Sequence, residues 1–368
     1  MRVFTFVKKN VVFCVALFCA LITCFLVPPD GKYFSYLDFN TLSCLFMTLA
    51  VVCALRNIKF FTIVARRLVM ISGTLRSLFV MLITITFLGS MLIANDMALI
   101  TFLPLGYFAL SVTGREKYMA YLFVLQNISA NLGGMLTPFG NPQNLYLYSY
   151  FHIPTLDFCK MMAPPFLLAI FLLFVCCLFV KNEPLSIDSK FPEPLNGKKT
   201  ALYLTLFALS LLVVFRVVPF LLGLAVIFIS IFILDKDALL SVDYALLGTF
   251  FFFFIFAGNL SRLEAVNHFF SGLMEKDALL VSVLSCQVIS NVPSAILLSR
   301  FTTEIHPLLL GVNIGGTGTL IASLASLITF SEFRILYPGH SKQYFFLFTV
   351  VNFLFLFIMT LAAKLFFL

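Results

Sequence analysis

The chain alternates long apolar runs with short polar breaks. The runs cover roughly 15–25 residues each, the length that an α-helix needs to cross the hydrocarbon core of a bilayer. Backbone polar groups in lipid must be satisfied within their own segment, so we expect the runs to be transmembrane helices. The expected spans are about 11–27, 41–55, 117–150 (interrupted), 163–180, 201–215, 217–234, 243–257, 306–330 (interrupted) and 343–367. This pattern predicts an all-α polytopic membrane protein.

Two further apolar stretches, 77–112 and 278–303, each contain a polar pair near the middle. The first pair is Asn95-Asp96 and the second is Ser290-Asn291. Such a pattern predicts a re-entrant helical hairpin, which enters the membrane, turns at a polar tip and returns to the same side. Non-helical backbone at that depth is tolerated only inside protein or along a water-filled cavity.

The two halves of the chain carry the same features in the same order. In the first half these are a span opened by Asp38, the mixed segment 56–68, a hairpin with Asn95 and Asn131-Leu132-Gly133-Gly134. In the second half they are a span opened by Asp243, segment 262–273, a hairpin with Asn291 and Asn313-Ile314-Gly315-Gly316. Each glycine pair is followed at the same distance by a threonine, Thr137 or Thr319. This match predicts two repeats, each with a hairpin and a discontinuous helix.

The expected organisation follows from these features. It comprises an N-terminal span (1–36), a first repeat (37–180), a cytoplasmic linker (181–200), connecting spans (201–234), a second repeat (235–330) and a C-terminal span (331–368). Lys8 and Lys9 precede the first apolar run as in a signal peptide. No small-x-small cleavage site follows, so we expect an uncleaved span.

The distribution of basic residues predicts the orientation. With a cytoplasmic N-terminus, 17 of the 24 Lys and Arg residues lie inside, as the positive-inside rule requires. The other seven are Lys32, Lys160, Arg216, Arg262, Lys276, Arg300 and Lys364. The first hairpin then enters from the cytoplasm and the second from outside, so the repeats are inverted. Inverted repeats with broken helices are typical of secondary transporters.

Composition narrows the function classes. The chain is 61% hydrophobic and 11% charged, which leaves no room for a soluble domain. The cytoplasmic cations account for the net charge of +8 without nucleic acid. The nine cysteines form no CxxC or Cys/His cluster, so neither a disulfide framework nor a zinc site is expected. No cofactor is expected beyond a coupling Na⁺ or H⁺.

Two glycine-rich clusters can hold a ligand within the membrane. The first, 127–144, contains Pro138 and Pro142, and its prolines and glycines are incompatible with a regular helix. Its freed carbonyls can coordinate a cation, and the N-terminus of a half-helix favours an anion. A surface loop is the structural alternative. The second cluster is 313–326. Its structural alternative to a ligand site is a face of small residues on which two helices pack closely.

Asp96 is the acidic residue predicted in the middle of an intramembrane segment, where ionisable groups are usually functional. It is a candidate for binding a coupling cation, and the alternative is a helix N-cap. The candidate substrate- and cation-binding residues are Asn95, Asp96, Asn131, Gly133, Gly134, Thr137, Gly140, Asn141, Asn144, Ser290, Asn291, Ser294, Asn313, Gly315, Gly316, Thr317 and Thr319. Among them, the candidate Na⁺ ligands are Asn95, Asn131, Asn291 and Asn313.

These motifs resemble the ion-transporter superfamily, which includes arsenite permeases, citrate transporters, sodium/proton antiporters and divalent anion:sodium symporters. The resemblance covers about residues 37–330. It implies substrate and cation sites between hairpin tips and unwound helices. The first tip, Ala94-Asn95-Asp96, is closer to the arsenite-permease and antiporter branch. The string from Thr137 to Asn144, TPFGNPQN, resembles bacterial citrate-transporter-like anion permeases.

The leading hypothesis is secondary active transport of a small anion, a carboxylate such as citrate or an inorganic oxyanion, coupled to Na⁺ or H⁺. The alternative is a Na⁺/H⁺ antiporter on the same scaffold. An enzyme is not expected, because the chain lacks a hydrolase triad and a nucleotide-binding loop. The expected partners are the anion, the coupling cation and the lipid of a bacterial plasma membrane. A homodimer is compatible with this interpretation.

Overall fold

The described part of the protein is helical. The structure is a computed structural model that describes residues 10–185 and 195–368, and within these ranges it contains no β-strand. Some predicted features lie outside the described residues, namely the cytoplasmic cations Arg2, Lys8, Lys9 and Lys190 and the middle of the predicted linker.

The helices follow the predicted spans and breaks closely. Those up to the linker are α2 (Val11–Leu26), α3 (Tyr33–Tyr36), α4 (Phe39–Asn57), α5 (Phe60–Val69), α6 (Leu75–Ile93), α7 (Asn95–Val112), η1 (Glu116–Tyr118), α8 (Met119–Gly133), η2 (Gly134–Leu136), α9 (Pro142–Tyr150) and α10 (Thr155–Leu178). Those after it are α11 (Gly197–Val214), α12 (Phe220–Leu234), α13 (Lys236–Leu240), α14 (Tyr244–Ser261), α15 (Glu264–Ile289), α16 (Asn291–Leu298), α17 (Ile305–Ile314), α18 (Leu324–Leu336), α19 (Ser341–Ala362) and η3 (Ala363–Phe367).

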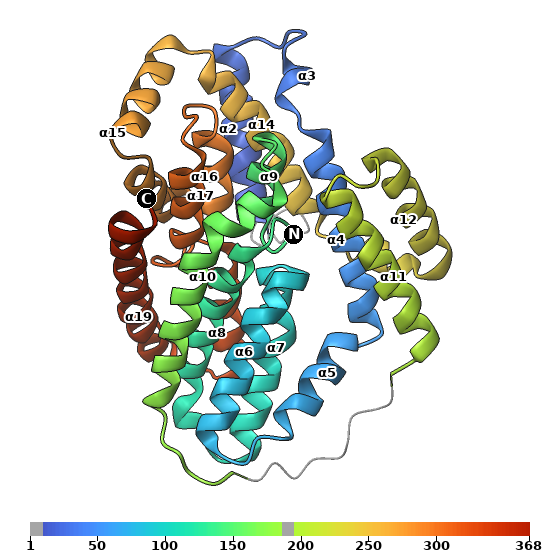
Figure 1. The fold of residues 1–368 in the computed structure, drawn as a ribbon, viewed down its shortest axis with the longest axis vertical. Helices are drawn as coiled ribbons and strands as arrows, with labels where there is room; N and C mark the ends of the chain where they lie inside the picture. Colours follow the sequence, from blue (N-terminus) through green and yellow to red (C-terminus); the bar gives the residue numbers. More distant parts are fainter. Residues whose placement is uncertain (1–9, 186–194) are drawn as a thin grey trace.

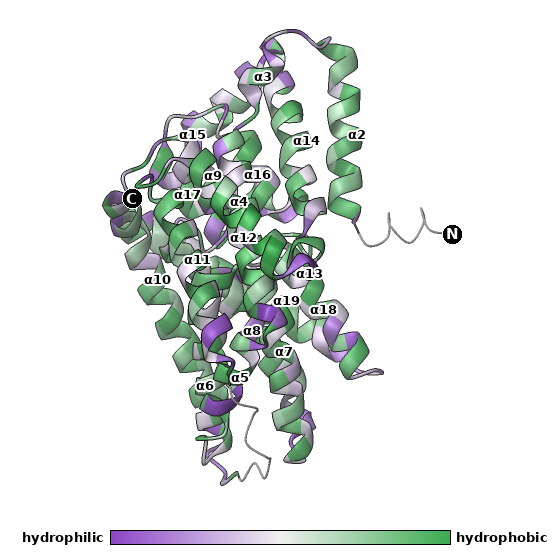
Figure 2. Ribbon diagram, turned by 90° about the vertical axis from the view of Figure 1, so that its right-hand side faces the viewer, coloured by the Kyte–Doolittle hydropathy of each residue, from purple (hydrophilic) through white to green (hydrophobic). Residues whose placement is uncertain are grey.

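Seven helices of the described chain are long and apolar enough to cross a membrane. They are α4, α6, α7, α10, α11, α14 and α19 continued through η3. The predicted polytopic all-α class is therefore confirmed. Figure 2 shows these helices largely hydrophobic along their length.

Two helical hairpins occur where the sequence predicts them. The first joins α6 to α7 through Ala94, and the second joins α15 to α16 through Ser290. In Figure 1 the first hairpin occupies the lower half of the molecule and the second the upper half, with both turns near mid-height. Helix α15 is broken at Asp277, between the predicted interfacial segment 262–273 and the predicted hairpin. The inverted symmetry and the repeat boundaries stay predictions.

The helices pack in two groups, which meet where α14 contacts α15 and α16 and where α4 contacts α9. In one group, α2 packs along α14 while α4 packs against α11, α12 and α13. In the other, α6, α7 and α8 pack together, α18 and α19 pack on α8, and α15, α16 and α17 form a second cluster. The hairpins and the interrupted helices therefore belong to the same group, beside the α2–α14 and α4–α11–α12 layer (Figure 1).

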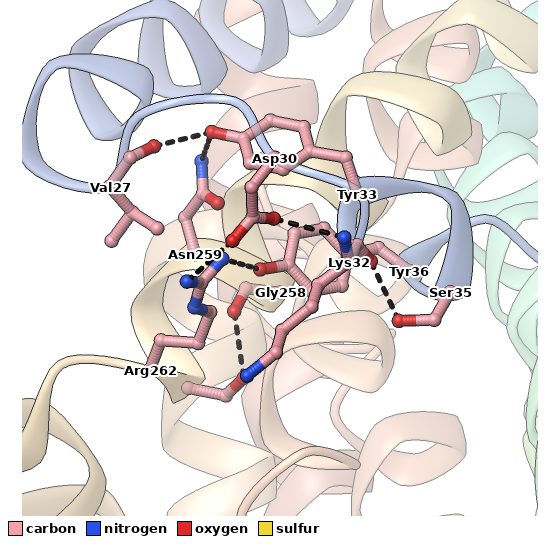
Figure 3. A network of polar contacts seen from close by, with 10 residues as sticks. Val27, Asp30, Lys32, Tyr33, Ser35, Tyr36, Gly258, Asn259 and Arg262 are labelled. Atoms are coloured by element: carbon pink, nitrogen blue, oxygen red, sulfur yellow. Dashed lines mark hydrogen bonds and ion pairs between the residues drawn. The ribbon is translucent and has the colours of Figure 1, made fainter.

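A polar network fixes the connection between α2 and α3 to the end of α14 (Figure 3). Arg262 forms an ion pair with Asp30 at 2.8 Å and donates to the Tyr36 hydroxyl at 3.0 Å. Asn259 donates to the Tyr33 hydroxyl at 2.9 Å. These contacts hold the far ends of α2 and α14 together, beyond the apolar packing between the two helices.

Candidate functional site

The two hairpin turns share an unusual backbone conformation. Ala94 has φ 64° and ψ 154°, and Ser290 has φ 75° and ψ 159°. This region is essentially restricted to glycine, and a residue with a side chain held there costs about 1–3 kcal/mol. Such strain persists only where the surroundings enforce it, and it gathers at functional sites. Both turns are therefore held in place by their neighbours.

The asparagine after each turn is the first residue of the returning helix, and in both helices its side chain accepts from the next N–H. The side-chain oxygen of Asn95 accepts from the Asp96 N–H at 3.0 Å, and that of Asn291 accepts from the Val292 N–H at 2.9 Å. The Asn95 amide also donates to the side-chain oxygen of Asn131 at 3.4 Å. The first tip thus ends in the polar N-terminus of α7, and the second in the polar N-terminus of α16.

The two interrupted helices are tied to the hairpins by equivalent contacts. The Thr137 hydroxyl donates to the Met91 carbonyl at 3.2 Å, and the Thr319 hydroxyl donates to the Gln287 carbonyl at 3.1 Å. Met91 and Gln287 each lie four residues before the asparagine of a hairpin tip. The matching contacts support the predicted repeat at the level of single hydrogen bonds.

The interrupted helices resume at equivalent positions. Asn141 is the N-cap of α9 and Ser323 is the N-cap of α18, and both have extended backbone. Each lies four residues after its threonine. The sequence strings after Thr137 and Thr319 differ, yet each break ends in an extended N-cap at the same distance from its threonine.

Amide side chains donate hydrogen bonds to several backbone carbonyls of the unwound segments. Asn144 donates to the carbonyls of Gly134 and Met135 at 3.2 and 3.3 Å, and its oxygen accepts from Asn313 at 2.6 Å. Gln287 donates to the carbonyls of Gly315 and Thr317 at 2.9 and 3.1 Å. These hydrogen bonds stabilise the unwound segments, and they use carbonyls that could otherwise bind a cation. Side chains and helix N-termini are therefore the main groups left to bind a ligand.

A cavity of about 500 Å³ lies between the two hairpin tips. Its lining comes from the first turns of six helices, α2, α7, α9, α14, α16 and α18. Side chains already accept from first-turn N–H groups of α7, α14 and α16. Each of the six helix N-termini still carries a partial positive charge. Their convergence favours a negatively charged or hydrogen-bond-accepting ligand.

The charged side chains of the cavity are acidic. Asp96 and Asp243 line it, and no lysine or arginine is among its lining residues that the structure describes. The Asp96 Oδ1 atom is buried without a hydrogen-bond partner, as is Oε1 of Gln143, a residue only 1% exposed. Unsatisfied buried acceptors are costly, so a proton or a metal cation at this position would stabilise them.

A family model described as "Citrate transporter" matches residues 3–309, which is most of the chain. The chain belongs to the citrate transporter family. Curated relatives include an uncharacterized transporter, MJ0456, of Methanocaldococcus jannaschii, 34% identical over 81% of this chain and 82% of its own. The inner membrane protein YbiR of Escherichia coli is 31% identical over 73% of each chain. The silicon efflux transporter LSI3 of rice is 31% identical over 42% of this chain and 32% of its own.

Family membership confirms several expectations for this citrate transporter homologue. It is a multi-pass membrane transporter and not an enzyme, and the resemblance to the ion-transporter superfamily is confirmed. Its substrate, its coupling cation and its orientation stay predictions.

The structure brings six of the predicted site residues together in two layers. Those lining the cavity are Asn95, Asp96, Ser290 and Asn291. Behind them, Asn131 contacts Asn95, and a side chain added at Gly316 would meet both Asn291 and Asn131. Of the four predicted Na⁺ ligands, Asn131 and Asn291 thus lie beside Gly316, and Asn95 joins them through Asn131. The backbone carbonyl of Asn313 also lies beside Gly316, while its side-chain amide donates to Asn144.

Other predicted residues have local structural contacts. Gly133 and Gly315 pack against the hairpin helices α6 and α15. Gly134 and Gly140 pack within the first unwound segment. The Ser294 hydroxyl contacts Ser285 at 2.9 Å, and Thr317 donates to the Ile314 carbonyl at 2.7 Å. Their direct role in binding stays a prediction.

Three residues outside the predicted set belong to the site. Asp243 and Gln143 line the cavity, and Gln287 holds the second unwound segment. Gln287 carried a sequence signal, because a lone glutamine in an apolar run must find buried partners. Asp243 opens a span just as Asp38 does. No sequence pattern shows which of these two aspartates lies near the hairpin tips.

Proposed function

We propose that this protein is a secondary active transporter that moves a small anion together with Na⁺ or H⁺. The observation that carries the proposal is the cavity between the two hairpin tips, where six helix N-termini meet two carboxylates. The N-termini attract an anion, and the carboxylates attract a cation. A site that holds both is the minimum needed to couple two fluxes.

The family favours a carboxylate such as citrate as the anion, since its model is described as a citrate transporter. An inorganic solute is the other candidate, because one relative is named a silicon efflux transporter. The cavity lacks a lysine or arginine among its described lining residues, so a multivalent anion would need accompanying cations. We expect the bound cation to neutralise Asp96 when the anion binds.

The test is transport by the full-length protein in proteoliposomes. A panel of radiolabelled citrate, succinate, phosphate and arsenite would be offered with and without inward Na⁺ and proton gradients. We expect one gradient to drive uptake of at least one compound, and Asp96→Asn to remove the effect of that gradient. Asp157→Asn is the matched control, since Asp157 is an exposed carboxylate beside Lys160. Absence of gradient-driven uptake of every compound would refute the proposal.

A second candidate is Na⁺/H⁺ antiport without an anion. It is favoured by the two carboxylates and the unpartnered oxygens of Asp96 and Gln143. A pH-sensitive dye trapped in the vesicles separates the two candidates. Antiport predicts that a Na⁺ pulse alone alkalinises or acidifies the lumen, whereas anion coupling predicts no change until the anion is added.

A further inference from the structure

Each predicted repeat opens with a span whose N-cap is an aspartate, Asp38 in the first and Asp243 in the second. The two aspartates differ in the hydrogen bonds that their side chains accept. Asp38, the N-cap of α4, accepts from the Thr41 N–H at 2.9 Å and from the Thr41 hydroxyl at 2.5 Å, so both of its oxygens are bonded. Asp243, the N-cap of α14, accepts from the Leu246 N–H at 2.9 Å through Oδ1. Leucine has no hydroxyl, and no described residue donates a hydrogen bond to Oδ2 of Asp243.

Asp243 also lies at the cavity, where Asp96 is the other carboxylate. The two come from different packed groups, Asp96 from hairpin helix α7 and Asp243 from α14. Gln143 is an independent sign of a ligand at this place, because its buried Oε1 faces no protein donor. Two acceptors at the cavity, Asp96 Oδ1 and Gln143 Oε1, are thus buried without a donor among the described residues.

Two other charged groups lie near the start of α14. Cys53 of α4 donates to the Ser241 carbonyl at 3.4 Å, which places the last turn of α4, with Arg56, beside the segment that leads to Asp243. Asp235 is the N-cap of α13, which also packs on α4. The Arg56 guanidinium contacts the Met97 sulfur at 3.4 Å, and Asp235 accepts from Asn57. Neither Arg56 nor Asp235 lines the cavity. Among the described residues that line the cavity, no cationic side chain therefore offsets the charges of the Asp96 and Asp243 carboxylates.

Two carboxylates beside one enclosed space repel each other, and a shared cation removes that repulsion. We propose that Asp243 is a second cation-coupling residue, which binds the coupling Na⁺ or proton together with Asp96 in the conformation seen here. This inference rests on the proposed cation-coupled transport. Because the two carboxylates belong to different packed groups, they share the cation only while the first hairpin tip faces α14.

The test measures cation binding without any anion. The full-length protein in detergent is heated at several pH values while NaCl replaces choline chloride. A cation that binds the folded state raises the melting temperature. We expect Asp243→Asn to raise the half-saturating concentration of the effective cation, Na⁺ or H⁺, about tenfold or more, a change of about 1.4 kcal/mol.

Asp38→Asn is the matched control. Asparagine is as good an N-cap as aspartate, so both variants keep their helix start and lose the carboxylate charge. Asp38→Asn also removes the oxygen that accepts from the Thr41 hydroxyl, which makes it the stricter control for a structural effect. We expect Asp38→Asn to keep the wild-type cation dependence and Asp243→Glu to recover most of it. A merely structural role for Asp243 would leave the cation dependence unchanged in Asp243→Asn.

The outcomes separate this inference from the proposed function. If gradient-driven uptake is present and Asp96→Asn loses cation-dependent stabilisation while Asp243→Asn keeps it, the role of Asp243 is refuted and cation-coupled transport stands. If the wild type shows neither cation-dependent stabilisation nor gradient-driven uptake, both are refuted. Equal losses in Asp38→Asn and Asp243→Asn would also refute the inference, because the effect would then follow helix capping.

Discussion

Gly133 and Gly315 allow the interrupted helices to pack closely against the hairpin helices, because neither residue has a side chain. A Cβ atom added at Gly133 would lie 2.2 Å from the Phe87 carbonyl oxygen, and one added at Gly315 would lie 2.9 Å from the Cys286 sulfur. Both neighbours belong to the entering helix of a hairpin. Any side chain at these positions would push a hairpin tip away from its unwound partner.

Substitution of Gly133 tests this close approach. Gly133→Ala should lower the melting temperature and abolish transport, because overpacking against rigid backbone costs about 1–3 kcal/mol or more. Gly272→Ala is the matched control, since Gly272 lies in helix α15 and an added Cβ meets nothing within 4 Å. Alanine stabilises a helix interior by about 0.5–1 kcal/mol relative to glycine, so this variant should melt at the same or a higher temperature. Equal behaviour of the two variants would contradict the packing account.

At the scale of elements, the sequence predicts well where the spans and breaks lie. It predicts poorly which helices and side chains pack against one another. Helices α10 and α19 follow from hydropathy, and both hairpin turns fall at the predicted polar pairs. These features are local, so a pattern of residue types is enough to locate them. The bond between Asn144 and Asn313 joins residues 169 positions apart, and only the packing of α9 against α17 creates it. Asp243 escaped prediction for the same reason.

The network at the end of α14 predicts a pH dependence. The Arg262 guanidinium, hydrogen-bonded to the Asp30 carboxylate, holds the pKa of Asp30 below its ordinary value. A lowered pKa contributes stability above the unfolded-state pKa of about 4, and this contribution is lost as pH falls through the folded-state value. The melting difference between wild type and Asp30→Asn should be small and constant from about pH 7 to 5 and should vanish in stronger acid. A difference that grows below pH 4 would contradict this assignment.

At the scale of the whole molecule, corresponding helices of the two predicted repeats have different surroundings. Helix α4 packs on α9, and Asn40 donates to the Ser149 hydroxyl at 3.2 Å. The corresponding pair by sequence order, α14 and α18, borders the cavity. Alternating access exchanges the surroundings of two inverted repeats, so we expect the α4–α9 contact to break during transport. The hydrophobic pattern predicted a broken-helix transporter but not which of these two pairs borders the cavity.

A cysteine pair tests this requirement. Asn40→Cys with Ser149→Cys, in a Cys44→Ala background, places two thiols where side chains now lie in hydrogen-bonding contact. Oxidation should lower gradient-driven uptake at least about tenfold, and reduction should restore it, because a disulfide would hold α4 on α9. Each single cysteine variant under the same oxidant is the control. Full transport by the cross-linked protein would show that this contact stays closed throughout the cycle.

The central claim is that one cavity between the two hairpin tips binds the transported solute. The most direct measurement is a cryo-EM structure of the full-length protein in lipid nanodiscs, with the compound and the cation selected by the uptake panel. The account predicts ligand density bounded by Asn95 and Asn291, with cation density at Asp96. Density confined to another part of the molecule, with both hairpin tips free of ligand, would contradict it.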